Sequence, residues 1–533
     1  MRWIARSFLL LAAGASTAAA RLAAQCPDGT PPPCRIASAP RTMAPPPLSI
    51  AVLPFESRSP DTADIYLADG VTEEVANKLT QVGKLQVKAR GLVAAQVRRT
   101  PDPTDAARRL GVAWFVHGNV RHVSGQLLVN VELVRAATGE EAWASRFPRR
   151  DTDVFAVQAE VAESVAVIVG GRLTPGERAV ITHRPTRNNE AYRLFLYGNT
   201  LMTRRTQNDV AQAVEAYTHA VTLDPRFAAA WARIGLARGV QRSWDWNTGL
   251  TNDSLLAIAR SSALRALALD STQAEAWLAN GFVEQLSRNL GAAHDSYDRA
   301  ARLDSLNAEV FHFYGTLYAL DCPGGTCLTN VQAGSLQFRR ALALDPGLRN
   351  TWRHLALLIE TAGRFSEAEA LFDTSLSFGP WPQSFHDRAT IRLLRRDVVG
   401  ARRDMEANLA AGGDPDTGQV AWAQAMEGDS SMAMAAARRL AELASPREID
   451  LIGLADLDMI LGRKDDAIAA LERIRALPEP VVARCGPANC STALHLWQVV
   501  SEGIFLPLRG QPRFDRLVED VRPHIPWLDA RSQ

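Results

Sequence analysis

The segment AEAWLANGFVEQLSRNLGAAHDSYDRAARLDS, residues 274–305, decides the architecture of most of this 533-residue chain. Its first half places Trp277 and Gly281 one helical turn apart, and its second half places Ala293, Tyr297 and Ala300 on one helical face. Small Gly and Ala side chains let two helices approach closely, while aromatic side chains fill the gap between neighbouring hairpins. The segment therefore predicts a hairpin of two packed helices.

The same pattern recurs along the chain. Its closing Leu-Asp motif returns with steps of 46, 34 and 41 residues, at Asp224, Asp270, Asp304 and Asp345. A period of 34 is that of the tetratricopeptide (TPR) repeat, which these segments resemble. The longer steps predict insertions at residues 242–250 and 322–328. We predict roughly eight TPR-type units over residues 190–478.

The last segment, residues 479–533, is predicted to be a helical cap. Its stretch LPLRGQPRFDRLV, residues 506–518, resembles the closing motif of proteins that join a TolB-like domain to TPR repeats.

A different pattern occupies residues 48–175. Apolar runs typical of strands alternate with helical spacing, and a hairpin is predicted across Ser124-Gly125. The predicted strands are 49–55, 85–89, 114–120, 127–134 and 142–147, and the predicted helices are 71–82, 104–110 and 154–173. Asp69-Gly70 is predicted to be a turn, with Thr72 capping the helix that follows. The fold class is therefore a small mixed-sheet α/β domain followed by an all-α TPR solenoid.

The α/β segment also resembles a known family. IAVLPFESRSPDTADIYLADGVTEEVANKLTQVGKLQVKARG, from residue 50, and ARRLGVAWFVHGNVRHVSGQLLVNVELVRAATGEEAWASRFPR, from residue 107, are similar to the TolB-like amino-terminal domain family. Such domains occur beside TPR arrays in bacterial exported proteins, and in the sensor or output halves of some adenylate cyclases, kinases and transcriptional regulators. The resemblance implies an interaction or sensing role, which leaves open a ligand contact at the rim of the Asp69-Gly70 motif.

The amino terminus predicts export. Residues 1–24 combine Arg2 and Arg6 with an apolar stretch and a small-residue cleavage site, as in a Sec-type signal peptide, and residues 25–47 form a proline-rich linker. An uncleaved anchor helix and lipid attachment at Cys26 are the alternatives. No other apolar run is long enough to span a membrane. We expect a periplasmic or otherwise exported protein.

The six cysteines fall into three close pairs: Cys26 with Cys34, Cys322 with Cys327, and Cys485 with Cys490. In an oxidising compartment, this spacing predicts three local disulfides. A zinc site is the weaker alternative because four ligands would have to converge. Redox-active cysteine pairs usually have two residues between the cysteines, whereas the pairs Cys322/Cys327 and Cys485/Cys490 each have four.

Composition and motifs argue against several functional classes. A net charge of +1 excludes wholesale capture of nucleic acid or an anionic membrane. No phosphate-binding loop, kinase or cyclase signature, nucleophile elbow or zinc-protease motif occurs, so we predict no catalytic residue, no metal and no cofactor.

Candidate binding residues come from the repeat register. Polar side chains predicted on the inner helices are Gln285, His312, Arg353 and Glu360. The inserted loop adds Trp244 and Trp246, either as binding anchors or as packing onto the array. An arginine-rich stretch, residues 388–403, is interleaved with acids, which favours a salt-bridged surface over an acid-binding face.

The sequence thus predicts an exported, non-enzymatic scaffold whose array binds a protein or peptide, with the α/β domain docking or sensing. The alternative is a regulatory module that acts on an envelope complex or a signalling enzyme encoded elsewhere. A hydrolase would need a catalytic constellation that the sequence lacks. The pattern does not predict the partner's identity, a small ligand of the α/β domain, the pathway or the oligomeric state.

If the cysteine pairing is right, the exported protein carries no free thiol and begins between Arg21 and Cys26. Intact mass and thiol titration of the secreted material measure both properties. Two or more titratable thiols would contradict the disulfide scheme.

Overall fold

The computed structural model describes residues 45–58, 63–123, 126–150, 154–244, 246–287, 289–319, 328–413, 415–443, 446, 448–477 and 503–521. The signal segment, nearly all of the linker and all six cysteines lie outside these ranges. The described elements belong to one compact unit, Pro46–Gln533.

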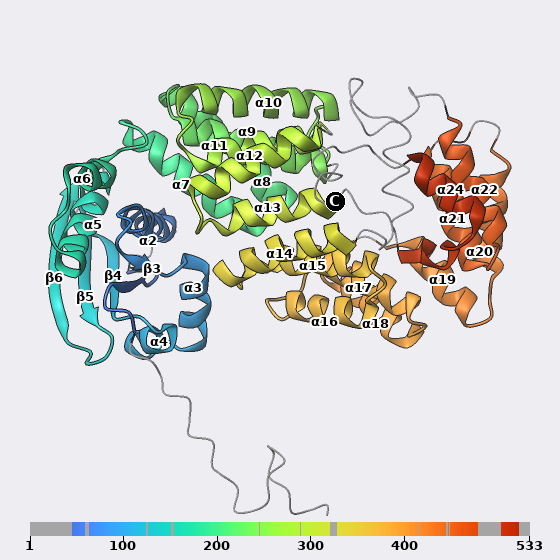
Figure 1. Cartoon of the computed structure of the whole chain (residues 1–533), viewed down its shortest axis with the longest axis horizontal. Coiled ribbons are helices and arrows are strands. Elements are labelled where there is room, and N and C mark those ends of the chain that lie inside the picture. The colour runs from blue at the N-terminus through green and yellow to red at the C-terminus, as the bar shows by residue number, and fades with distance from the viewer. Residues whose placement is uncertain are drawn as a thin grey trace, which may run out of the picture. The chain divides into compact units, whose positions relative to one another are not determined.

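A mixed sheet forms the first domain (Figure 1). Its strand order is β3-β1-β4-β5-β6, and β2 also pairs with β4. Strands β3, β1, β2 and β4 pair in parallel, whereas β4, β5 and β6 pair antiparallel. The bounds are β1 Ser49–Val52, β2 Glu56–Ser57, β3 Gln86–Val87, β4 Trp114–Val123, β5 Gln126–Arg135 and β6 Glu141–Arg150. The mixed sheet and its long hairpin confirm the predicted α/β fold.

Helices cover both faces of this sheet. Helices α2 (Ala63–Gln81) and α5 (Val154–Gly170) pack on one apolar face, and α3 (Arg90–Arg99) and α4 (Pro103–Leu110) pack on the other. Helix α6 (Pro175–Thr182), which the sequence patterns did not predict, packs against α2 and α5. The helical layer on this face of the sheet therefore continues past residue 175, where the α/β domain was predicted to end.

The predicted turn at Asp69-Gly70 is wrong. Both residues lie inside α2, and Thr72 is no cap, because its hydroxyl donates to Ala68 O at 2.8 Å and accepts from the N–H of Phe55 at 2.9 Å. Gly70 allows close packing of α2 against the first array helix, because a Cβ at this position would lie 2.4 Å from a methyl of Leu196. The α/β domain and the array consequently share one apolar core.

After α6 the described chain is built of helical hairpins (Figure 1). The first, or inner-type, helices are α7 Asn189–Arg204, α9 Ala228–Ser243, α11 Ala274–Leu286, α13 Ala308–Ala319, α15 Arg349–Thr361, α17 Pro382–Leu394, α19 Thr417–Met426 and α21 Glu448–Ile460. Their partners are α8 Gln207–Leu223, α10 Asn252–Leu269, α12 Leu290–Leu303, α14 Leu328–Leu344, α16 Phe365–Leu376, α18 Val398–Ala410, α20 Ser431–Ala441 and α22 Lys464–Arg475. These pairs confirm the predicted TPR solenoid.

Local interactions explain where the hairpins turn. In four repeats the carboxylate of the Asp that follows the second helix accepts a hydrogen bond from the N–H two residues later, at 2.8–3.1 Å. This Asx-turn ends the helix without a glycine. Trp231, Trp277 and Trp352 then donate their indole N–H to a carbonyl six residues earlier, at 2.8–3.0 Å, which fixes the start of the next repeat.

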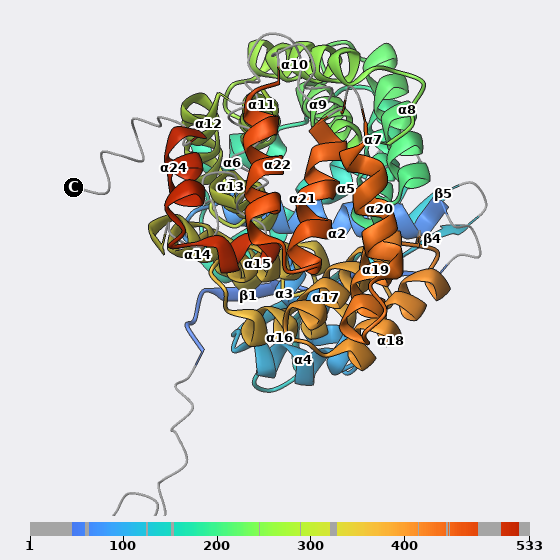
Figure 2. The same cartoon turned by 90° about the vertical axis from the view of Figure 1, so that its right-hand side faces the viewer.

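Of the segment predicted to be a carboxyl-terminal cap, the structure describes residues 503–521. The 3₁₀ segment η3 (Gly503–Leu508) and helix α24 (Pro512–Val521) bury Phe505, Leu508 and Phe514 in one apolar cluster with residues of α20–α22. Figure 2 shows α24 beside α22. The stretch LPLRGQPRFDRLV thus packs on the last repeats, and its role as a closing cap stays a prediction.

Replacing Gly315 by Ala should destabilise the protein. An added Cβ would lie 2.5 Å from the buried ring of Phe338, an overpacking that costs about 1–3 kcal/mol and outweighs the roughly 1 kcal/mol gain in helix propensity. Urea unfolding of the full chain measures the change. The control is Gly176→Ala in α6, where the added Cβ would meet no packed neighbour within 4 Å among the described residues. An equal effect of both substitutions would contradict this account.

Candidate functional site

The predicted inner-helix residues do not form one open surface. Gln285 is 6% exposed. Its amide donates to the Thr316 hydroxyl at 3.1 Å and accepts from the Tyr297 hydroxyl at 2.7 Å. Both ends of the side chain are thus occupied within the array, so Gln285 links neighbouring repeats.

His312 is buried as well. Its Nδ1 lies 2.9 Å from the Thr351 hydroxyl, and its ring stacks on His354 with centroids 5.1 Å apart. Burial, together with the charge of Arg205, lowers the pKa of His312 to about 3. The imidazole therefore stays neutral at physiological pH, and its ring packs inside the array instead of facing a partner.

A charge cluster beside His312 was not predicted from the sequence. Glu309, at the start of α13, lies 2.6 Å from the Arg233 guanidinium and 3.0 Å from that of Arg205. Burial alone would raise the pKa of Glu309, but the two guanidinium groups hold it below its usual value. Arg205 reaches this position from a left-handed backbone conformation, φ 56°, directly after α7. The cluster ties three repeats together.

Glu360 near the end of α15 is 9% exposed. Burial, reinforced by the nearby Asp387 carboxylate, raises its pKa to about 8. At neutral pH it is mostly protonated, which makes it a poor group for holding a cationic partner.

Three tryptophans and two arginines meet where the inserted loop of α9 reaches α15 and α17; we call Trp244, Trp246, Trp381, Arg349 and Arg353 the Trp–Arg cluster. The Trp244 ring centroid lies 5.5 Å from that of Trp246 and 6.4 Å from that of Trp381. The guanidinium of Arg353 lies 5.9 Å from both Trp244 and Trp381, and that of Arg349 lies 4.8 Å from Trp381. Of the predicted site residues, the structure therefore brings Trp244, Trp246 and Arg353 together. Trp381 and Arg349 were missed because their proximity depends on the path of the array.

The two arginines of the Trp–Arg cluster differ in their partners. Arg353 Nε lies 2.5 Å from the Asp387 carboxylate. Arg349 donates only to the backbone carbonyl of Arg204, at 3.3 Å, and has no carboxylate within ion-pair distance in the described part of the chain. Burial lowers the pKa of Arg349 below its usual value. Arg349 is thus a partly desolvated cation to which the described residues supply no counter-ion.

Helix α9, which leads into the Trp–Arg cluster, carries two further half-buried arginines. The Nε atoms of Arg238 and Arg242 find no hydrogen-bond partner among the described residues, and burial lowers the pKa of both side chains. Neither forms an ion pair among the described residues. This end of α9 is therefore positively charged.

The arginine-rich stretch on α17 and α18 is a salt-bridged surface, as the sequence favoured. Arg388 binds Asp404 with two hydrogen bonds of 2.6 and 2.9 Å, and Arg392 bonds to Asp404 and Glu369. The chain itself thus neutralises these cations. Within the described ranges, no group of three or more His, Cys, Asp or Glu is placed to hold a metal ion, and no helix is long and apolar enough to cross a membrane.

Known proteins resemble parts of this chain. Residues 47–163 match the family model of the HilA/YgeH-like transcriptional regulator, second domain. The match overlaps the segment in which we saw a TolB-like resemblance, which it does not confirm. A protein of Rhizobium meliloti (strain 1021) named "Putative adenylate cyclase 3" is 33% identical over 223 residues, which are 42% of this chain and 38% of that protein. The chain thus spans less than half the length of this relative.

Among solved structures, PilF of Pseudomonas aeruginosa is similar with 18% identity and a TM-score of 0.29, over 48% of this chain and 93% of that one. A thermophilic TPR protein of Thermus thermophilus is similar with 17% identity and a TM-score of 0.29, over 41% of this chain and 99% of that one.

Replacing Glu360 by Gln should stabilise the protein at alkaline pH. The folded state holds a proton that the unfolded state releases above about pH 4.5, so the stability supplied by neutral Glu360 is present in acid and is lost as pH rises through 8. Gln stays neutral throughout. The variant should gain about 2 kcal/mol or more over wild type between pH 5 and 9, because one pKa unit is worth about 1.4 kcal/mol.

Urea titrations of the full chain at pH 5, 7 and 9 measure this difference. The control is Glu442→Gln at an exposed site, whose stability should stay parallel to that of wild type. A Glu360→Gln difference that does not grow with pH would contradict the assignment of a neutral buried carboxyl.

Proposed function

We propose that the chain is a non-enzymatic scaffold whose array binds an acidic segment of a protein or peptide at the Trp–Arg cluster. The observation that carries this proposal is Arg349, stacked on Trp381 without a carboxylate partner in the described residues. A ligand carboxylate placed there would neutralise the cation and accept two hydrogen bonds from its planar guanidinium.

The aromatic side chains support a binding surface. Trp244 and Trp246 are only partly buried, although they pack against the main apolar core. Tryptophan and arginine are among the side chains that most often dominate the binding energy of protein interfaces. Arg353, held by Asp387, keeps a second guanidinium against the rings. The cluster thus offers apolar area and positive charge at one place.

Charge selectivity follows from the neighbouring residues. Arg238 and Arg242 add positive charge on α9, whereas Arg205 and Arg233 are already neutralised by Glu309. An acidic segment would therefore be attracted, and a basic segment repelled. In this proposal Gln285, His312 and Glu360 hold the array together and do not contact the partner.

For the α/β domain we propose docking or sensing beside the array, in an exported protein. The supporting feature is a hollow of about 500 Å³ between β6 and α5, where Val167 and Ile168 are each 40% exposed beside Trp143 and Phe147. The regulatory alternative, action on an envelope complex or a signalling enzyme, would use this hollow as the second contact.

Replacing Arg349 by Gln should weaken the binding of acidic peptides about tenfold, because a lost charge-assisted hydrogen bond costs about 1.5–3 kcal/mol. Fluorescence polarisation of the full chain with labelled Glu/Asp-rich peptides, each compared with its Gln/Asn counterpart, measures this affinity.

The matched control is Arg340→Gln, which removes a guanidinium stacked 4.0 Å over Phe311 in another part of the array. Its peptide affinity should equal that of wild type. If acidic peptides bind no better than neutral ones, or if Arg349→Gln binds like wild type, the Trp–Arg cluster is not the binding site.

A further inference from the structure

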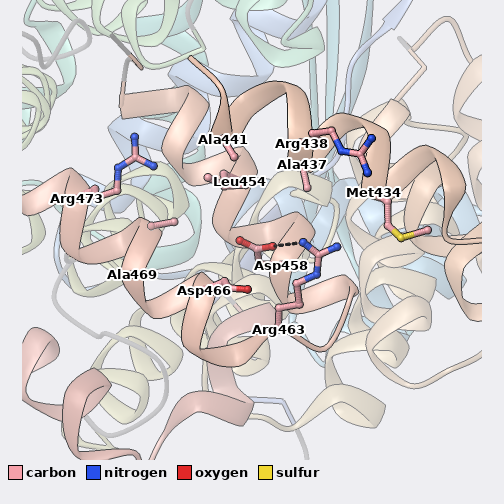
Figure 3. A pocket seen from close by; sticks show the side chains of 11 residues that line it. Met434, Ala437, Arg438, Ala441, Leu454, Asp458, Arg463, Asp466, Ala469 and Arg473 are labelled. Carbon is pink, nitrogen blue, oxygen red and sulfur yellow. Dashed lines mark ion pairs between the residues drawn. The ribbon is translucent and has the colours of Figure 1, made fainter. Parts of the chain in front are cut away.

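A hollow of about 380 Å³ lies on α20, α21 and α22, near the end of the repeats (Figure 3). We call it the α20–α22 pocket. Its apolar lining includes Ala437, Leu454 and Ala470, which are buried at 2%, 6% and 3% exposure. Its volume falls in the range in which small-molecule sites occur, about 300–1,000 Å³.

A carboxylate with few partners faces this hollow. Asp458 of α21 is 4% exposed, and the only ion pair of its carboxylate among the described residues is with Arg463, at 3.6 Å. That distance is too long for a hydrogen bond. No N–H or O–H in the described chain donates to this carboxylate, although buried carboxylates normally accept several such bonds. Asp458 therefore has acceptor capacity to offer a ligand.

Two cations flank the carboxylate. Arg438 of α20 and Arg473 of α22 stand on opposite sides of the pocket, and neither forms an ion pair among the described residues (Figure 3). The walls thus present positive charge from two helices, while the deeper Asp458 presents negative charge. Asp466 adds a second carboxylate to the lining.

We propose that the α20–α22 pocket binds a small zwitterion with an apolar side chain, of the size of a free dipeptide. Its ammonium group donates to Asp458, its carboxylate lies within reach of Arg438 or Arg473, and its side chain packs on Leu454. A simple anion such as phosphate fits less well because Asp458 and Asp466 repel it. A simple cation fits less well because three arginines surround Asp458.

The experiment is isothermal titration of the full chain with leucyl-leucine and two capped forms of it. N-acetyl-leucyl-leucine lacks the ammonium group, and leucyl-leucine amide lacks the carboxylate. We expect leucyl-leucine to bind, and each capped form to bind about tenfold more weakly or less, since each loses one charge-assisted contact.

Two variants test the assignment of each end. Asp458→Asn should weaken leucyl-leucine about tenfold and leave the acetylated form unchanged, because that form never used the carboxylate. Arg438→Gln with Arg473→Gln should weaken leucyl-leucine and leave the amide unchanged. Asp458→Asn keeps the side-chain volume, and circular dichroism with thermal unfolding checks that each variant is folded.

The matched control is Arg439→Gln, an exposed neighbour of Arg438 that does not line the pocket. Equal affinities for the free and capped dipeptides, no measurable binding at millimolar dipeptide, or unchanged binding by folded Asp458→Asn would each overturn the proposal. Arg349→Gln should not affect dipeptide binding, so this site and the Trp–Arg cluster can fail separately.

Discussion

The close approach of a glycine to an aromatic ring in three of the hairpins controls the geometry of the first part of the array. A Cβ on Gly198, Gly281 or Gly315 would lie 2.5–2.7 Å from the ring of Tyr217, Tyr297 or Phe338 in the partner helix. These rings are fully buried, so they cannot move aside without opening a cavity. The contact therefore fixes the distance between paired helices, and stacking of the pairs propagates this spacing along the solenoid.

Close spacing also decides the role of the inner polar residues. Glu309 reaches arginines that lie 76 and 104 residues earlier in the sequence. In such surroundings an isolated charge is expensive, which is why Glu309 has two cations, His312 is neutral and Glu360 takes up a proton. The 34-residue period predicts which side chains lie on inner helices, but it does not predict how close those helices lie to one another.

The sequence predicted features that depend on neighbouring residues, such as helix ends and strand faces. It did not predict contacts between residues that lie far apart in the chain. The Asp residues after each repeat act through hydrogen bonds two residues away, and strand alternation reflects a face that any sheet would bury. Asp69-Gly70 misled because glycine in a helix is normally unfavourable, while here Leu196, more than 120 residues later, occupies the space that a side chain would need. Likewise, Trp381 contacts Trp244 although 137 positions separate them in the sequence, a proximity that no local pattern predicts.

Charge balance separates structural positions from binding positions in this molecule. The side chains of Arg388, Arg392 and Arg233 are only 13–18% exposed, and carboxylates of the chain itself neutralise them. Arg349 and Asp458 instead bear charges that the described chain leaves incompletely compensated, one beside aromatic rings and the other in a hollow. Such groups do not stabilise the fold. Burial removes part of the hydration of each charge, and few interactions with the chain compensate for that loss. A ligand that supplies the opposite charge would offset this loss, and both proposed sites rest on that electrostatic argument.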